Sequence, residues 1–291
     1  MKELLIKKEA LKEGLLFYNI EINDYIEKCY QCLKNINNNI ELKNKINYVL
    51  NLLYTNTDNI IEKLWKQRDL EEYLGKNYNK FIHSIIIISG YKIHEENMNK
   101  YKFDKYQIST HKKRVRECLT NDIYKKNLKA IRLSQLLWGL YFINIRLIEV
   151  GRLQYEYCNK DNKKCIKIHI PPGSKLLLNE VINSLEKSKF EIKRYFYLEN
   201  IEYYCESWLL SKEIKSLLNS NSNIYNFQKL FDIKDGENAI KDILNFVYGL
   251  QEVNNFEELQ ENTRLQKRIK ELLLKKTEIH KGIGKLKAYR Q

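Results

Sequence analysis

The chain has 291 residues, enough for two domains of ordinary size. Hydrophobic residues make up 43% and charged residues 30%, a balance that excludes an intrinsically disordered protein. The formal net charge of +14 suits an anionic partner such as nucleic acid or a phosphorylated ligand, but Lys, Asn, Ile and Tyr, which A/T-rich codons specify, are all abundant. The charge therefore has two explanations, codon bias and a real anion site.

No membrane span or metal site is expected. The apolar run from Leu133 to Ile145 is shorter than the ~20 residues that cross a bilayer. Cys29 and Cys32 form a CxxC in a helix-like segment, without a second pair or a histidine at zinc-finger spacing. Because the chain starts without a signal peptide, we expect reduced cysteines and a cytoplasmic location.

The first 150 residues have the apolar period of helices. In "LKNKINYVLNLLY" the residues Leu42, Ile46, Val49, Leu50 and Leu53 share one helical face. Polar breaks such as "NINNN" and "YTNTDN" favour turns between helices. The segment "FIHSIIIISGY" fits either a strand or a buried helix.

After Gly151 the period changes to that of strands. "RLQYEYC" and "CIKIHI" alternate between two faces around the polar interval "NKDNKK", which predicts a β-hairpin. Strand pairing must stop at Pro171 and Pro172, because proline has no N–H to donate. A helix through "EVINSLEKSKFEIKRYF" follows, with Ser174 or Asn179 as its expected cap.

The remaining elements predict a mixed sheet. "YYCES" reads as a strand, then a short helix follows, and "IYNFQKLFDI" and "NFVYG" read as further strands. A strand, a helix and a second strand imply a right-handed crossover and a central parallel pair. The fold class is therefore α+β or α/β, with a helical domain over residues 1–125 and a mixed sheet flanked by helices over residues 126–291.

This order of elements resembles the GNAT superfamily of acyltransferases. The matching pieces are "RLQYEY", "IHIPPG", "CESWLL", "SNIYNFQKLF" and "NTRLQKRIKELL", which fall in the same order over about residues 150 to 285. The resemblance is greatest to a bacterial family in which a helical N-terminal domain precedes a GNAT-like C-terminal domain. The N-terminal half is similar only in being helical and of similar length.

The resemblance implies a coenzyme A-dependent N-acyltransferase, most simply one that uses acetyl coenzyme A and an unidentified amine acceptor. The pantetheine arm would pair with the backbone of the strand that contains Ile168 and Ile170. The pyrophosphate would meet N–H groups of Gly173, Ser174 and Lys175. Most members of the superfamily carry a Q/R-x-x-G-x-G/A loop, whereas this chain has "PPGSK", with a single glycine and no arginine.

Four residues are candidates for the chemistry. Glu206 lies in an apolar strand and could accept the proton of the acceptor amine, or else face solvent or pair with a lysine. His169, at the end of the other central strand, could act as the general base, because the unperturbed pKa of histidine suits that role, or else it bonds to a backbone carbonyl. Ser207 could hold the substrate or the thiol leaving group, or merely satisfy a backbone carbonyl, and the resemblance adds Tyr225 as the proton donor to the departing thiolate.

Two other functions compete with acyl transfer. The basic face and the 21 tyrosines would suit nucleic-acid binding, although no recognised nucleic-acid motif is present. The unusual phosphate loop would also suit a catalytically inactive GNAT-like binding module. The cluster "HKKRVR", His111 to Arg116, could receive the outer phosphate of the cofactor, or form a solvated helix face.

Overall fold

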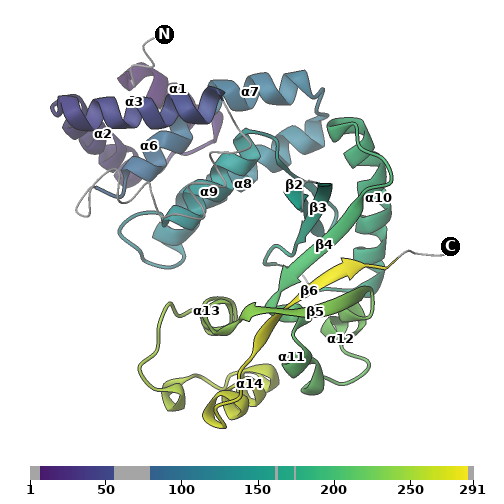
Figure 1. Cartoon of the computed structure of the whole chain (residues 1–291). Coiled ribbons are helices and arrows are strands. Elements are labelled where there is room, and N and C mark those ends of the chain that lie inside the picture. Colours follow the sequence, from purple (N-terminus) through teal and green to yellow (C-terminus); the bar gives the residue numbers. More distant parts are fainter. Residues whose placement is uncertain (1–6, 56–78, 161–162, 174, 288–291) are drawn as a thin grey trace. The chain divides into compact units, whose positions relative to one another are not determined.

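The computed structural model describes residues 7–55, 79–160, 163–173 and 175–287. The chain divides into two compact units, Met1–Ile148 and Glu149–Gln291 (Figure 1). The domain boundary expected between residues 125 and 126 stays a prediction.

The N-terminal unit is helical, as its apolar period predicts. Within its described residues, the regular elements that precede β1 are all helices. Their bounds are α1 Lys8–Phe17, α2 Asn23–Asn37, α3 Ile40–Thr55, α6 Ile82–Ser89, α7 Tyr91–Lys100, α8 Lys105–Tyr124 and α9 Leu133–Ile143.

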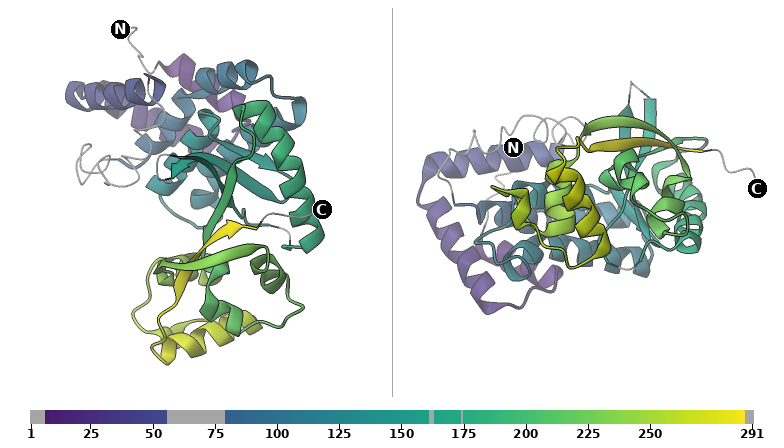
Figure 2. Two further views of the ribbon diagram at one scale, coloured as in Figure 1. Left: turned by 45° about the vertical axis from the view of Figure 1, so that its right-hand side comes forward. Right: turned by 90° about the horizontal axis from the view of Figure 1, so that it is seen from below.

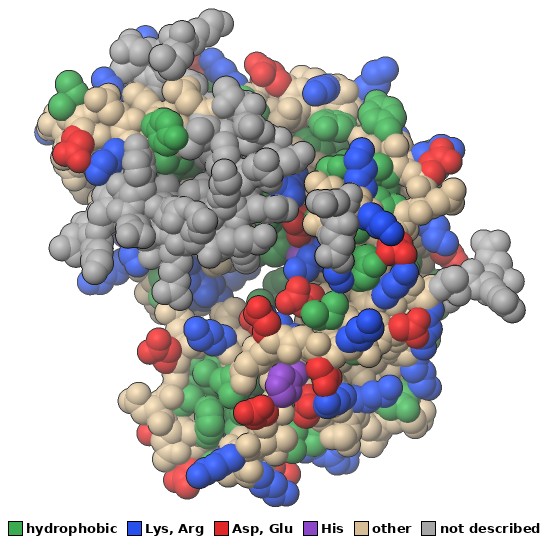
Figure 3. All heavy atoms as spheres, viewed as in Figure 1, with side chains coloured by type: hydrophobic (Ala, Val, Ile, Leu, Met, Phe, Trp, Pro, Cys, Tyr) green, Lys and Arg blue, Asp and Glu red, His purple; other side chains and the backbone are tan. Residues whose placement is uncertain are grey.

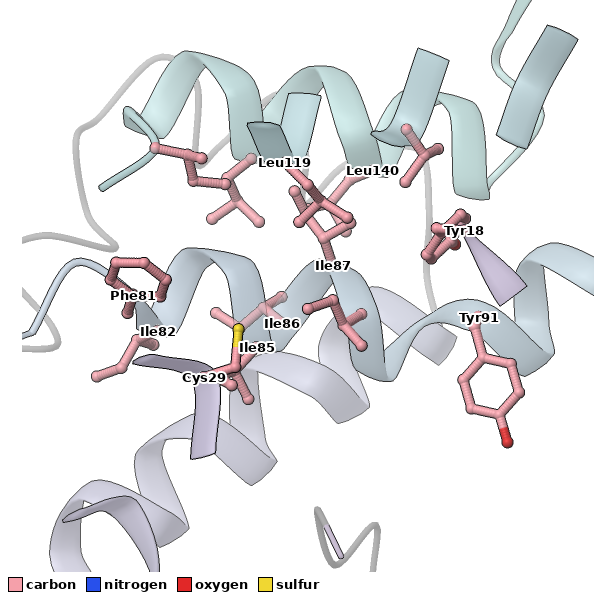
Figure 4. Close-up of a cluster of buried hydrophobic side chains, with 14 of the residues drawn as sticks. Tyr18, Cys29, Phe81, Ile82, Ile85, Ile86, Ile87, Tyr91, Leu119 and Leu140 are labelled. Atoms are coloured by element: carbon pink, nitrogen blue, oxygen red, sulfur yellow. The ribbon is translucent and has the colours of Figure 1, made fainter. Parts of the chain in front are cut away.

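Helix α6 is the centre of this unit, and it settles the ambiguous segment "FIHSIIIISGY" as a buried helix. Seven of its eight residues are buried. A helix that is apolar all round must be covered on every side. Helices α1, α2 and α9 pack against α6, with Ile87, Leu119 and Leu140 among the side chains of the core (Figure 4).

The C-terminal unit is built on a six-stranded sheet with the order β1-β2-β3-β4-β6-β5. The strands are β1 Leu147–Val150, β2 Leu153–Lys160, β3 Lys163–His169, β4 Glu202–Ser207, β5 Phe231–Asn238 and β6 His280–Leu286. The antiparallel pair β2–β3 confirms the predicted hairpin, and the parallel pair β3–β4 confirms the predicted centre of the sheet. Strand β6 pairs antiparallel with both β4 and β5.

The helices of this unit are α10 Leu178–Phe196, α11 Lys212–Ser216, α12 Asn223–Gln228, α13 Ile240–Ile243 and α14 Arg264–Leu274, with shorter turns η1 Trp208–Leu210, η2 Leu244–Tyr248 and η3 Phe256–Glu258. Helix α10 forms the crossover from β3 to β4 and lies along the sheet (Figures 1 and 2). Ser184 of α10 bonds to the hydroxyl of Tyr155 at 2.8 Å, so the side of the sheet that carries Tyr155 faces α10.

Two predicted strands are wrong. "IYNFQKLFDI" divides into α12 and β5, because the side chain of Ser222 accepts from the N–H of Tyr225 and so caps a helix there. "NFVYG" is the π-helical turn η2, in which Leu244 and Tyr248 are buried while Phe246 is exposed. A spacing of four between buried residues is a helical spacing, and a strand would bury every second residue.

The last strand, β6, is not predicted by the sequence, because the two glycines of "GIGK" are a weak signal for any element. A Cβ at Gly282 would lie 2.3 Å from the carbonyl oxygen of Leu210, and one at Gly284 would lie 2.8 Å from the side chain of Phe231. Glycine is therefore needed here for the close approach of η1 and β5 to the strand.

The expected cap of α10 is also wrong. The N-cap residue is Leu177, and no side chain caps it, while Asn179 lies inside the first turn of the helix. Leu177 has an extended backbone (ψ 133°), so the helix begins only after the whole loop that follows the prolines.

Candidate active site

The candidate site lies where the two central strands separate. The parallel pairing of β3 with β4 extends from Cys165 opposite Glu202 to Ile168 opposite Cys205. Beyond that point β3 continues only beside β2, where His169 is opposite Gln154, and β4 continues only beside β6, where Ser207 is opposite Gly282. Within the described residues, the facing backbone edges of the two strands thus no longer pair with each other, and an extended ligand can use such an edge.

The two isoleucines expected at the cofactor lie differently. Ile168 is only 1% exposed and lies on the face of the sheet that carries its register partners Tyr155 and Cys205. Its side chain is therefore part of the core, and only its backbone could serve a ligand. Ile170 follows the end of β3 and is half-buried.

The loop after β3 is open at its centre. Gly173 and Lys175 are exposed, and Ser174 lies outside the described residues. Gly173 has φ +137°, which side chains of L-residues rarely adopt, and a Cβ at this position would meet nothing within 4 Å. Glycine is required here by backbone conformation, and a Cβ would point away from the described residues other than its chain neighbours.

Arg152, in the turn between β1 and β2, holds this loop to the sheet, although no motif in the sequence singles it out. Its Nη1 donates to the carbonyl oxygen of Pro171 at 2.9 Å, and its Nε donates to that of Lys175 at 3.4 Å. A guanidinium presents several donors in one rigid plane, so one side chain can fix both ends of a short loop.

The start of α10 lies directly after this loop. The first N–H groups of a helix have no partner within the helix, and no side chain caps this one. They belong to residues from Leu178 onward, beyond the Gly173 to Lys175 segment in which phosphate-binding N–H groups were expected. An uncapped helix start attracts anions through these donors and the helix dipole.

Glu206 is paired with a lysine. Its carboxylate accepts from Lys167 Nζ at 3.0 Å, across the parallel strands, and both side chains are about one-third exposed. Burial acts to raise the pKa of Glu206, but the Lys167 charge and hydrogen bond outweigh it, so the pKa is lowered. Burial likewise acts to lower the pKa of Lys167, but the Glu206 charge raises it. This is the lysine pairing that the sequence left open, and a lowered pKa makes Glu206 a weaker proton acceptor.

His169 is paired with a carboxylate that the sequence analysis missed. Its Nε2 lies 2.7 Å from Oε2 of Glu156 on the neighbouring strand β2. The side chain of Glu156 is only 10% exposed and that of His169 only 19%. Glu156 stands between two tyrosines in "YEY", which is the same signal, a carboxylate in an apolar strand, that drew attention to Glu206.

These residues share one face of the sheet. Glu156 is opposite Lys167 in the register of β2 and β3, and Lys167 alternates with His169 along β3. Lys167 Nζ also feels the charge of Glu156, which raises the lysine pKa. Glu156, Lys167, His169 and Glu206 therefore form one charged cluster from three adjacent strands, at the end where β3 and β4 separate.

A second buried polar pair lies beside this cluster. Gln154 Nε2 donates to Glu149 Oε2 at 2.7 Å, and both side chains are buried. Gln154 is directly opposite His169 in the strand register. Buried polar groups with partners are held rigidly, so they give His169 a fixed neighbour.

The contacts of Ser207 and Tyr225 are with residues outside the cluster of Glu156, Lys167, His169 and Glu206. The hydroxyl oxygen of Ser207 accepts from the N–H of Leu209 at 3.1 Å and caps the turn η1. Tyr225 lies in α12, with the ammonium groups of Lys215 and Lys229 at 5.4 and 4.8 Å from the centre of its ring. The chemical roles of both residues stay predictions.

The described residues contain neither a membrane-spanning helix nor a metal-binding cluster. None of the helices there is long and apolar enough to cross a membrane. Groups of three or more His, Cys, Asp and Glu residues that could hold a metal ion are likewise not found among them.

The comparisons with known structures report the same fold. An acyltransferase in complex with decanoyl-CoA aligns with a TM-score of 0.64 and 19% identity, over 71% of this chain and 66% of that one. An acyltransferase in complex with CoA and 10C-teicoplanin has the same TM-score and identity, over 72% of this chain and 67% of that one. An acyltransferase mutant in complex with octanoyl-CoA aligns with a TM-score of 0.65 and 17% identity, over 83% of this chain and 78% of that one.

This chain spans about two thirds of the length of the first two of these proteins. No curated protein matches it. Residues 147–286 match the family model described as the GNAT-like C-terminal domain, which covers the whole sheet from β1 to β6. Residues 147–286 are therefore similar to the GNAT-like C-terminal domain family, and the mixed sheet that they form is the GNAT-like fold.

Proposed function

We propose that this chain transfers an acyl group from a coenzyme A thioester to an amine of an acceptor. The observation that carries the proposal is the separation of β3 and β4 next to His169, within a GNAT-like domain. The acyltransferases of similar fold in complex with decanoyl-CoA and octanoyl-CoA support a thioester of coenzyme A as the donor.

The cofactor would occupy the gap between the strands and the loop that follows β3. The pantetheine amides would pair with the backbone at Ile168 to Ile170, where β3 has lost β4 as its neighbour. The phosphates would meet the open loop at Gly173, Ser174 and Lys175 and the uncapped start of α10.

The reaction needs a base, because an amine near neutral pH carries an extra proton. His169 would take that proton, and the amine nitrogen would then attack the thioester carbonyl carbon. The tetrahedral intermediate collapses as the C–S bond breaks, the nitrogen loses its remaining extra proton, and the departing thiolate of coenzyme A takes up one proton, so that the proton held on His169 is the net proton released to solvent. We assign base function to His169 ahead of Glu206, because Glu206 is neutralised by Lys167 and its pKa is lowered.

The length of the acyl chain and the identity of the acceptor define the substrates of the proposed reaction. The expectation of an acetyl group stays a prediction, and so does a cytoplasmic location. The acyltransferases of similar fold hold decanoyl-CoA and octanoyl-CoA, and one is in complex with CoA and 10C-teicoplanin. A panel of acyl-CoA donors from two to ten carbons therefore includes acetyl-CoA and the two acyl-CoA molecules bound by the similar structures.

A thermal-shift screen tests the proposal with coenzyme A, acetyl-CoA, octanoyl-CoA, decanoyl-CoA and a single-stranded DNA oligonucleotide. A ligand that binds only the folded chain raises its melting temperature, by an amount that follows its concentration relative to Kd. We expect at least one acyl-CoA to do so. Thiol release measured with that donor and a panel of primary amines then tests transfer itself. Stabilisation by DNA alone would replace the proposal with nucleic-acid binding, and stabilisation by coenzyme A without thiol release would favour an inactive binding module.

The surface charges favour acyl transfer over nucleic-acid binding. On the face of the C-terminal unit seen in Figure 3, basic and acidic side chains are interspersed. Lys281 pairs with Asp242 at 3.0 Å, and Lys212 and Lys285 pair with Asp235 and Glu202. Lysines that are already paired with carboxylates have less charge to offer phosphates.

A further inference from the structure

We propose that Glu156 is a positioning residue that sets the tautomer of His169. This inference rests on the proposed function, in which His169 is the base. Its central claim is the tautomer of the His169 ring, which can be measured without any activity. An ionised carboxylate only accepts hydrogen bonds, so Glu156 Oε2, 2.7 Å from His169 Nε2, keeps the proton on Nε2. In the neutral ring the lone pair is then on Nδ1, which becomes the proton-accepting atom.

The position of Glu156 is fixed by the sheet. β2 and β3 pair antiparallel from Gln154 opposite His169 to Lys160 opposite Lys163, so the two side chains lie on adjacent strands in a continuous ladder. The side chain of Glu156 is nine-tenths buried. A buried carboxylate on a paired strand has few alternative positions, so it holds the imidazole ring in one orientation.

The charge of Glu156 has a second effect during the reaction. When His169 takes a proton from the acceptor amine, the ring becomes a cation, and the adjacent carboxylate stabilises it. Lys167 lies opposite Glu156 in the register, but its ammonium group donates to Glu206. The carboxylate of Glu206 is thus the hydrogen-bond partner of Lys167, while Glu156 lies 2.7 Å from His169 and also interacts with the charge of Lys167.

The test reads the ring directly, by long-range proton–nitrogen NMR of the histidine side chains in the full chain. The His169→Ala variant identifies the signals of this ring among the five histidines. In the unsubstituted chain we expect the pattern of a ring protonated on Nε2. Glu156→Ala and Glu156→Leu, which remove the acceptor, should both lose that pattern. Glu202→Gln, on the exposed end of β4, is the matched control and should leave the pattern unchanged.

Turnover gives the second measurement once an amine acceptor is known. Glu156→Ala should lower kcat by about 10- to 100-fold, the range found when a metal-bound histidine loses the carboxylate that orients it. KM for the acyl-CoA should stay near its original value, because Glu156 does not touch the donor. Unchanged signals of His280 and an unchanged melting curve show that the variant is folded.

The outcomes separate this inference from the proposed function. A ring protonated on Nδ1 in the unsubstituted chain, or an Nε2 pattern that survives in folded Glu156→Ala, overturns the inference whether or not the chain is an acyltransferase. If Glu156→Ala is unfolded, Glu156→Leu decides, because leucine fills a similar volume without an acceptor, and an Nε2 pattern that survives in that variant overturns the inference. An Nε2 pattern that depends on Glu156, in a chain that transfers no acyl group, would leave the positioning in place and remove the proposed function.

Discussion

Lys167 and Glu206 form an ion pair of 3.0 Å across the only parallel strand pair among the described residues, next to the point where these strands separate. Each partner shifts the pKa of the other toward the charged form. Glu206, the carboxylate that the sequence suggests as a base, therefore already forms an ion pair with Lys167. His169, paired with the buried Glu156, is the other candidate in the cluster.

The first prediction compares the two candidate bases. His169→Ala should lower turnover by about 10²-fold near neutral pH, and by much less at high pH, where the acceptor amine is already deprotonated. Glu206→Gln should have the smaller effect, because its charge is neutralised by Lys167. Both variants should bind acyl-CoA normally in calorimetry. A larger loss in Glu206→Gln than in His169→Ala would return the base role to Glu206.

The second prediction concerns the loop glycine. Gly173→Val should weaken coenzyme A binding, because a β-branched residue cannot hold φ +137° and must displace the backbone N–H groups of the loop. Gly249→Val is the matched control, since Gly249 also has a positive φ (+71°) and open space around it, but ends the distant turn η2. Calorimetry should show weaker binding only for Gly173→Val, and equal affinities for the two variants would place the cofactor elsewhere.

The third prediction tests the arginine that holds the loop. Arg152→Met removes the donors to the carbonyl oxygens of Pro171 and Lys175, so the loop should become less ordered and the affinity for coenzyme A should fall. Arg152→Lys should rescue the affinity only in part, because an ammonium group lacks the planar set of donors. Binding is measured by calorimetry on proteins whose melting temperature is unchanged. Full affinity in a folded Arg152→Met variant would show that the hydrogen bonds from Arg152 to the loop have no part in ligand binding.

The fourth prediction concerns the acid stability of the N-terminal unit. Burial lowers the pKa of His111 to about 3, against a hydrogen bond with the backbone of Phe142 that acts to raise it. Burial and the neighbouring charges of His111 and Lys112 lower the pKa of His94 well below its ordinary value. Each ring is neutral in the folded chain but binds a proton in the unfolded chain below about pH 6.5.

Stability contributed by these histidines is therefore complete above about pH 6.5 and is lost as the pH falls from there toward the folded-state pKa, by at most about 1.4 kcal/mol per pH unit and ring. Urea denaturation followed by circular dichroism at about pH 7 and about pH 5 should show this fall. His111→Leu should reduce the difference between the two pH values. An equal free energy of unfolding at both values would show that these rings are not neutral and buried in solution.

Local patterns in the sequence were sufficient for much of the fold. The helical period of the N-terminal half, the alternation in "RLQYEYC" and "CIKIHI" and the prolines that end β3 all predicted elements that the structure contains. These signals are reliable because backbone geometry and the missing proline N–H act within a few residues. The same reasoning failed for η2 and β6, where a short apolar run and a pair of glycines fit more than one element.

The partners within the candidate site were decided only by the tertiary structure. Alternation along β3 indicates that Lys167 and His169 share a face, but not which carboxylate each one meets. That depends on the register between strands: Glu206 is 39 residues from Lys167 in the chain, and Glu156 is 13 residues from His169. Strand pairing is set by the packing of the whole sheet against α10 and the later strand β6, so a carboxylate recognisable in the sequence acquires its pKa only when the sheet has formed.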